Sequence, residues 1–249
     1  GLEGLIGAVG PGVALTLIVA TPLLYSVPEA LLIGELASML PVEGGYYEWV
    51  KRAFGPFGGF CNGWLSFAYS LVDMALYPVL FQQYLAFLFP GVGKLAAWAI
   101  SLGLVWLATL LNLRGTRVVG IASGWFAAAV LLPFLVLAAA AAHEWFAASH
   151  VALPIEPYHT PGVSFVGALG SGISLSIWNY SGWDNPSTIE GELDDAGKNY
   201  PRALARTLPL VTLVYLISVL PVLAVTDYRK WTDGAWPALG TEVVGGWLG

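Results

Sequence analysis

The chain has 249 residues, of which 57% are hydrophobic and only 10% are charged, and its formal net charge is −6. Soluble globular domains carry about 25% charged residues, so this chain cannot cover itself with polar surface, and we expect a lipid bilayer to cover part of it. The net negative charge argues against a nucleic-acid partner. The single cysteine excludes an internal disulfide and any multi-cysteine metal site. No metal or cofactor is expected, because the sequence contains neither a P-loop nor a His-Glu-x-x-His motif.

Apolar stretches predict the membrane spans in chain order. A helix needs roughly 20 residues to cross a hydrocarbon layer about 30 Å thick. Between the spans we expect a polar, aromatic loop at 41–56, with a short interfacial helix in it as an alternative, an external loop at 143–162 with all three histidines, and a charged loop at 191–205. The predicted spans are residues 1–10 (the end of a span), 13–40, 58–89, 94–112, 118–142, 163–190 and 207–226.

The distribution of lysine and arginine predicts the orientation, because loops on the cytoplasmic side are enriched in these residues. If the 41–56 loop lies in the cytoplasm, seven basic residues fall inside and three outside. The inside set is Lys51, Arg52, Arg114, Arg117, Lys198, Arg202 and Arg206, and the outside set is Lys94, Arg229 and Lys230.

The sixth span contains a stretch that does not suit a plain membrane helix. Residues 179–186 read "NYSGWDNP", in which Ser181-Gly182 weakens the helix and Pro186 removes a backbone N–H. Unwound backbone at membrane depth persists only where protein or a water-filled cavity satisfies it. A simple kink is one interpretation, but a break with a carboxylate, an amide and three aromatic rings favours a binding site. The site residues predicted here are Trp178, Asn179, Tyr180, Ser181, Gly182, Trp183 and Asp184.

The start of the chain, "GLEGLIGAVGPG", is also a poor membrane helix. Its regularly spaced glycines fit close helix packing, with Gly1, Gly4, Gly7 and Gly10 on one side. The alternative is a second discontinuous helix. Secondary transporters place such helices at corresponding positions of two inverted repeats, with the substrate between them. The first and sixth spans are corresponding members of a five-plus-five repeat.

Other acidic residues at membrane depth have less specific surroundings. Glu35 is close to the end of its span, which favours a structural or interfacial role. Glu29 follows Pro28, and a paired carboxylate at a helix kink is somewhat favoured over a substrate contact. Asp73 has Tyr77 one turn later on the same face, so it either pins two helices or lines a pathway.

Two long motifs carry a resemblance to the amino acid–polyamine–organocation superfamily of permeases. They are "IGELASMLPVEGGYYEWVKRAFGPFGGFCNGW" and "NYSGWDNPSTIEGELDDAGKNYPRAL". Together with "MALYPVLF", they resemble most closely the branch of bacterial permeases and plant polyamine uptake transporters. The resemblance implies an all-α integral membrane protein with a LeuT-like five-plus-five inverted-repeat fold and broken helices 1 and 6. Residues 1–249 are then a single, incomplete transporter domain, from the second part of helix 1 to just after helix 7.

The resemblance also implies a function. The expected activity is secondary active transport of amino acids or polyamines, coupled to protons, by alternating access in the cell membrane. Trp178 matches the family's aromatic residue that covers the substrate, and Asp184 matches an acidic residue found just after the break. Gly1-Leu2-Glu3-Gly4 departs from the family pattern, since Glu3 stands where a neutral residue is common, and this departure favours a cationic substrate.

We therefore expect the substrate to lie between the two breaks. Backbone groups of Gly1 to Gly4 and of Asn179 to Gly182 hold its polar ends, and Asp184 and Glu3 pair with ammonium groups. The aromatic faces come from Trp178, Tyr180 and Trp183. Tyr77 completes the wall, and Asp73, Asp184 and Glu3 are the candidates for the coupling proton.

Alternatives to this interpretation stay open. A neutral amino acid fits the superfamily as well as a polyamine does. A membrane sensor, or a non-transporting protein that binds such a substrate without flux, is the second class. An intramembrane enzyme is disfavoured, because the three histidines lie far in sequence from the broken helices.

Overall fold

A computed structural model describes residues 1–147 and 162–245. Within these ranges the chain is helical and contains no strand. The expected external loop at 143–162 lies largely outside the described residues. Its first histidine, His143, belongs to a helix rather than to a loop.

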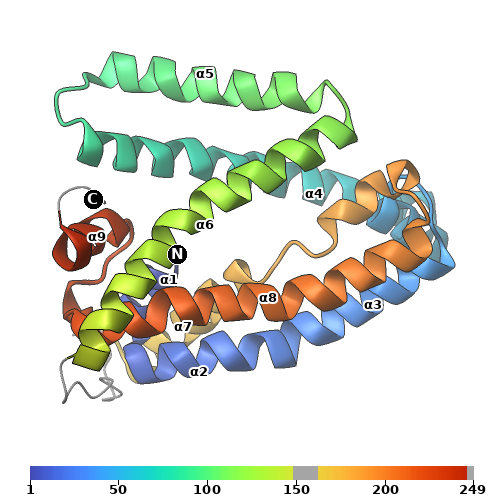
Figure 1. The fold of residues 1–249 in the computed structure, drawn as a ribbon. Coiled ribbons are helices and arrows are strands. Elements are labelled where there is room, and N and C mark those ends of the chain that lie inside the picture. The colour runs from blue at the N-terminus through green and yellow to red at the C-terminus, as the bar shows by residue number, and fades with distance from the viewer. Residues whose placement is uncertain (148–161, 246–249) are drawn as a thin grey trace. The chain divides into compact units, whose positions relative to one another are not determined.

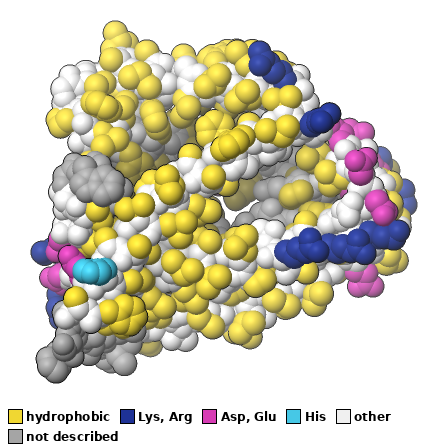
Figure 2. All heavy atoms as spheres, in the orientation of Figure 1, with side chains coloured by type: hydrophobic (Ala, Val, Ile, Leu, Met, Phe, Trp, Pro, Cys, Tyr) yellow, Lys and Arg dark blue, Asp and Glu magenta, His cyan; other side chains and the backbone are white. Residues whose placement is uncertain are grey.

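Five helical segments among the described residues are long and apolar enough to cross a membrane. The first consists of α2 (Pro11–Thr21), the π-helix η1 (Pro22–Ser26) and α3 (Val27–Met39) in direct succession. Figure 2 shows hydrophobic side chains spread over α5 and α6, as expected of helices that face lipid or other helices. The other four segments are α4 (Gly45–Leu88), α5 (Lys94–Asn112), α6 (Thr116–Ala147) and α8 (Ala196–Val225).

Five of the seven predicted spans agree with these segments, while those at 1–10 and 163–190 contain shorter helices. The polar start of α4 is separated from its apolar part at Gly55, whose φ of 79° breaks the helix where the 41–56 loop was expected to end. The prediction of a loop over 191–205 is wrong beyond Asp195, because α8 already begins at Ala196. The helical period was present in the sequence, and the residues buried along this face are Ala196, Tyr200, Leu204 and Leu208.

The chain divides into two compact units, with the divisions inside α4 and α8. Unit 1 comprises Gly1–Ser70 and Ile155–Leu216, and unit 2 comprises Leu71–Pro154 and Ile217–Gly249. Figure 1 traces the elements along the chain. The expectation of a single transporter domain stays a prediction.

Unit 1 is organised around α7 (Phe165–Asn179). The short first helix, α1 (Leu2–Val9), packs against it, and Val9 lies where a Cβ on Gly172 would stand. The α2 helix runs along α7 in the same direction. Ser176 meets Thr21 with 2.8 Å between the two hydroxyl oxygens, and the Tyr180 carbonyl lies at Ser26.

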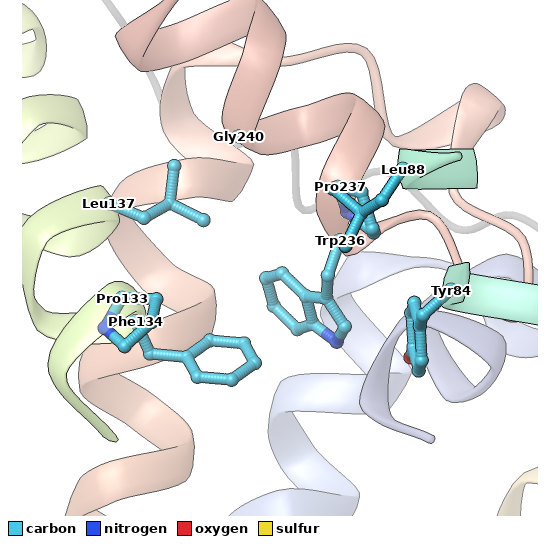
Figure 3. Close-up of a pocket in the computed structure, with 8 residues that line it drawn as sticks. All are labelled: Tyr84, Leu88, Pro133, Phe134, Leu137, Trp236, Pro237 and Gly240. Atoms are coloured by element: carbon cyan, nitrogen blue, oxygen red, sulfur yellow. The ribbon is translucent and has the colours of Figure 1, made fainter. Parts of the chain in front are cut away.

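Unit 2 contains a pocket between α6 and α9 (Trp236–Val244). The rings of Phe134 and Trp236 meet edge to face, with their centroids 5.1 Å apart (Figure 3). The pocket has a volume of about 250 Å³ and no charged residue in its lining. A site for a cationic substrate needs a negative partner, so this pocket does not fit one. Its lining consists of Tyr84, Leu88, Pro133, Phe134, Leu137, Trp236, Pro237 and Gly240.

Candidate functional site

The sixth span is interrupted where the sequence predicts it. The α7 helix ends at Asn179, and the 3₁₀-helix η2 (Asn185–Glu192) begins after five intervening residues without helical structure. Gly182 has a φ of 98°, a backbone conformation that favours glycine because it has no Cβ. Residues 180–184 are called the break from here on.

Hydroxyl groups from neighbouring helices satisfy carbonyls that the interruption frees. The Tyr215 hydroxyl donates to the Asn179 carbonyl at 2.9 Å. The Ser26 hydroxyl donates to the Tyr180 carbonyl at 3.4 Å, and the Tyr200 hydroxyl donates to the Trp183 carbonyl. An unsatisfied carbonyl in hydrocarbon costs several kcal/mol, so these donors explain how the break is tolerated at membrane depth.

One of these donors provides a test. We expect Tyr215→Phe to lower the stability of the protein by about 0.6–2 kcal/mol, because it removes an interhelical hydrogen bond and keeps the ring. The measurement is thermal unfolding of the purified protein in detergent. An unchanged midpoint would show that the Asn179 carbonyl does not depend on this hydroxyl.

The π-helix η1 lies beside the break. Ser26, its last residue, bonds to the Tyr180 carbonyl, while the Tyr180 hydroxyl donates to the Ile18 carbonyl at 2.8 Å on the preceding turn. Single π-turns are frequent at functional sites, because the wider turn changes the direction in which side chains leave the helix. The irregular turn of the second span therefore faces the irregular stretch of the sixth.

This arrangement places the Glu29 and Asp184 carboxylates within range of electrostatic interaction. Tyr25, in η1, interacts with the side chains of Ser181 and Glu29. Glu29, one turn further along, interacts electrostatically with Asp184. One carboxylate oxygen of Glu29 is buried without a hydrogen-bond partner. From the sequence, Glu29 was favoured as a paired acid at a kink. Its position against Asp184 adds Tyr25 and Glu29 to the candidate site.

The three aromatic residues predicted to contact substrate differ in their surroundings. Trp178 is 36% exposed, so part of its side chain is accessible. Trp183 is partly buried against a cluster that includes Trp49 and Tyr200, and its indole N–H has no partner. Tyr180 is only 1% exposed, and its ring packs edge to face on Tyr215 at 5.2 Å. In this conformation Tyr180 joins helices together.

A groove opens on the η2 side of the break. It has a volume of about 580 Å³ and is lined by Gly182 and Trp183 from the break. Its opposite wall comes from the start of α8, where Tyr200 is buried and Asn199 is exposed. Asp194 also lines the groove and contributes a carboxylate to it. A groove of this size, with an acid and two aromatic rings, can admit a small organic cation.

The predicted residues of the first span lie on α1. Glu3 is 4% exposed and stands in the first turn, next to Gly1 at the start of the helix. Gly4 follows in the same turn, so Gly1 to Gly4 form a helix N-terminus. The first N–H groups of a helix lack intrahelical acceptors and favour negative groups. Their predicted contact with substrate stays a prediction.

Asp73 and Tyr77 belong to unit 2. The Tyr77 hydroxyl donates to the Asp73 carboxylate at 3.4 Å, one turn apart on α4. The expected pair on one helix face is therefore present.

Among residues 1–147 and 162–245, no group of three or more His, Cys, Asp or Glu side chains could hold a metal ion.

Five apolar helices of membrane-spanning length, together with two acids beside an interrupted helix, indicate a multi-pass integral membrane protein. A family model described as amino acid permease matches residues 2–248, so the chain belongs to the amino acid permease family. An all-α chain with these spans agrees with the LeuT-like fold that the resemblance implies.

Curated relatives extend over the same residues. The chain is 36% identical over 254 residues to the polyamine transporter PUT1 of Oryza sativa subsp. japonica, covering 100% of this chain and 46% of the relative. It is 34% identical over 259 residues to the polyamine transporter RMV1 of Arabidopsis thaliana, covering 100% and 50%. A b(0,+)-type amino acid transporter 1 from Oryctolagus cuniculus is 26% identical over 199 residues, covering 76% and 39%. The chain thus spans about half the length of the curated relatives it matches.

Proposed function

We propose that the protein acts in secondary active transport of polyamines, with the substrate bound at the break. The observation that carries this proposal is the juxtaposition of Asp184 and Glu29 beside an interrupted helix. The polyamine transporters among the relatives support the substrate class, and the amino acid permease family supports transport rather than catalysis.

Two carboxylates in one place favour a substrate with ammonium groups. Two acids that repel each other at membrane depth are costly unless a cation joins them or a proton neutralises one. A hydrogen bond to a charged group contributes about 1.5–3 kcal/mol. Trp178, whose side chain is partly accessible, adds a cation–π contribution of about 0.5–2 kcal/mol. A polyamine, with several ammonium groups separated by methylenes, satisfies both acids and an aromatic wall.

In the proposed cycle the break serves as a joint between two rigid helical pieces. The α7 side is held by α1 and α2, while the η2 side is held by α8 through Tyr200. Rocking of one piece against the other opens the substrate site to one side of the membrane at a time. Glu3, at the N-terminus of α1, belongs to the pathway in this proposal, and Asp73 and Tyr77 stay candidates from the sequence.

Proton coupling and location are part of the same proposal. A carboxylate that is desolvated in one conformation and hydrated in the other binds a proton in only one of them, which is the requirement for coupling. The candidates from the sequence for the residue that binds the coupling proton are Asp73, Asp184 and Glu3.

We place the protein in the plasma membrane.

A second candidate function is transport of neutral or cationic amino acids. The similarity to a b(0,+)-type amino acid transporter favours it. An amino acid would direct its ammonium group to Asp184 and its carboxylate to free N–H groups at a helix start, as at Gly1 to Gly4.

Flux measurements in proteoliposomes test the proposal. The protein, with its natural flanking sequence, is reconstituted, and uptake of labelled putrescine or spermidine is followed with and without an inward proton gradient. We expect gradient-driven uptake of polyamine that a panel of amino acids competes for weakly. Strong competition by neutral amino acids would favour the second candidate. Binding of polyamine without flux in either condition would identify a sensor.

A further inference from the structure

Glu190 is a buried acid that the proposed substrate site does not use. It stands near the end of η2, its residue is 1% exposed, and neither carboxylate oxygen has a hydrogen-bond partner. Two residues further along, Glu192 is exposed. The same short segment therefore contains one exposed acid and one buried acid.

Two elements of unit 1 pack around Glu190 and bury it. On one side lies the α3–α4 turn, residues 40–44, where the Gly44 N–H donates to the Thr188 carbonyl at 3.1 Å. The next residues continue the contact, since the Tyr46 N–H donates to the Ser187 hydroxyl at 3.4 Å. On the other side lies α8, whose Tyr200 interacts electrostatically with Glu190.

Glu190 is a carboxylate without a cationic partner in the described part of the chain. Among the residues that the structure describes, no Lys or Arg forms an ion pair with Glu190. Two lysines on the packed elements have other partners, Lys51 with Glu48 at 2.8 Å and Lys198 with Asp195 at 3.3 Å. The titratable groups on the elements packed around it include Glu29, Glu43, Tyr46, Tyr47, Glu48, Lys51, Arg52, Asp184, Glu192, Asp194, Asp195, Lys198, Tyr200 and Arg202.

An ionised carboxylate without a partner is too costly to bury, so the group is neutral in this arrangement. We propose that Glu190 is a proton-binding residue of the transport cycle, which holds a proton while the α3–α4 turn is docked on η2 and releases it when the turn moves away. This inference rests on the proposed function. It assigns the coupling proton to a residue other than Asp73, Asp184 and Glu3.

The sign of the pH effect follows from linkage. The docked arrangement favours the protonated carboxyl, so low pH stabilises docking, and raising the pH through the titration of Glu190 weakens it. If the turn undocks on the side facing the higher pH, the proton leaves there. Each cycle then carries one proton down its gradient together with the substrate.

The test separates coupling from substrate movement. In proteoliposomes whose membrane potential is held at zero, an inward gradient of one pH unit drives accumulation of about tenfold for each coupled proton. We expect E190Q, which mimics the protonated acid, to exchange labelled for unlabelled spermidine but to lose this accumulation. We expect E192Q to accumulate like the wild type. Accumulation by E190Q at the wild-type level would overturn the proposal, and so would loss of exchange together with accumulation in a folded E190Q protein.

An infrared measurement gives an answer even if the protein transports nothing. A protonated carboxyl in a dry site has a carbonyl stretching band that an ionised carboxylate lacks. We expect the wild type and E192Q to show this band at neutral pH and E190Q to lose the part of it that Glu190 contributes. Persistence of the whole band in E190Q would contradict a protonated Glu190. A failure of the proposed transport function alone would leave the band unchanged.

Discussion

Replacing Asp184 by asparagine is expected to reduce the efficiency of polyamine uptake by about 10- to 100-fold, because the variant loses a charged hydrogen bond of about 1.5–3 kcal/mol. The measurement is the initial rate of spermidine uptake in proteoliposomes over a range of concentrations. The effect is expected mainly in KM, since the lost interaction is made with the bound substrate.

Glu29 allows this prediction to be sharpened. If both acids contact one substrate, Glu29→Gln also weakens uptake, and the double variant departs from additivity by about 0.5–3 kcal/mol. Two exposed acids provide matched controls. Asp195→Asn is the control for Asp184→Asn, and Glu35→Gln is the control for Glu29→Gln. Additive effects of Asp184→Asn and Glu29→Gln would contradict a shared ammonium group.

Replacing Gly45 by alanine is expected to destabilise the protein by at least about 2 kcal/mol and to abolish transport. Gly45 has a φ of 39°, which favours glycine, and an added Cβ would lie 2.5 Å from the carbonyl carbon of Ser187. Since Ser187 is completely buried in η2, the clash forces the start of α4 away from it. Thermal unfolding and uptake are the measurements.

Gly170→Ala is the matched control for that variant. Gly170 lies inside α7, and nothing stands within 4 Å of the position that its Cβ would take. Alanine is favoured over glycine in a helix by about 1 kcal/mol, so this variant is expected to be as stable as the wild type or more so. An equal loss of stability in both variants would show that contact between Gly45 and Ser187 is not the cause.

Features carried by local sequence could be predicted. The α5 span ends where the apolar run ends, at Lys94 and Asn112, and both limits agree with the structure. The break follows from Ser181-Gly182 and Pro186 inside an apolar stretch, since these residues disfavour a continuous helix whatever packs against them. We predicted a loop at the start of α8 because this stretch is rich in charged residues. These residues nevertheless recur every four positions, as expected on one face of a helix.

Features that depend on packing between distant segments could not be predicted. The pairing of Glu29 with Asp184 requires the register of α2 along α7, and that register is defined by contacts such as Thr21 with Ser176. The π-helix η1, which turns Tyr25 toward the break, has no clear sequence signal. The burial of Glu190 depends in the same way on the docking of the α3–α4 turn, more than 140 residues earlier in the chain.

The central claim is that an amine substrate binds at the break, beside Asp184 and Glu29. The most direct measurement is an electron cryomicroscopy structure of the protein with spermidine. The account predicts ligand density at residues 180–184, with an ammonium group within about 4 Å of the Asp184 carboxylate. Ligand density confined to another part of the protein, such as the apolar pocket between α6 and α9, with no ligand near Asp184, would contradict it.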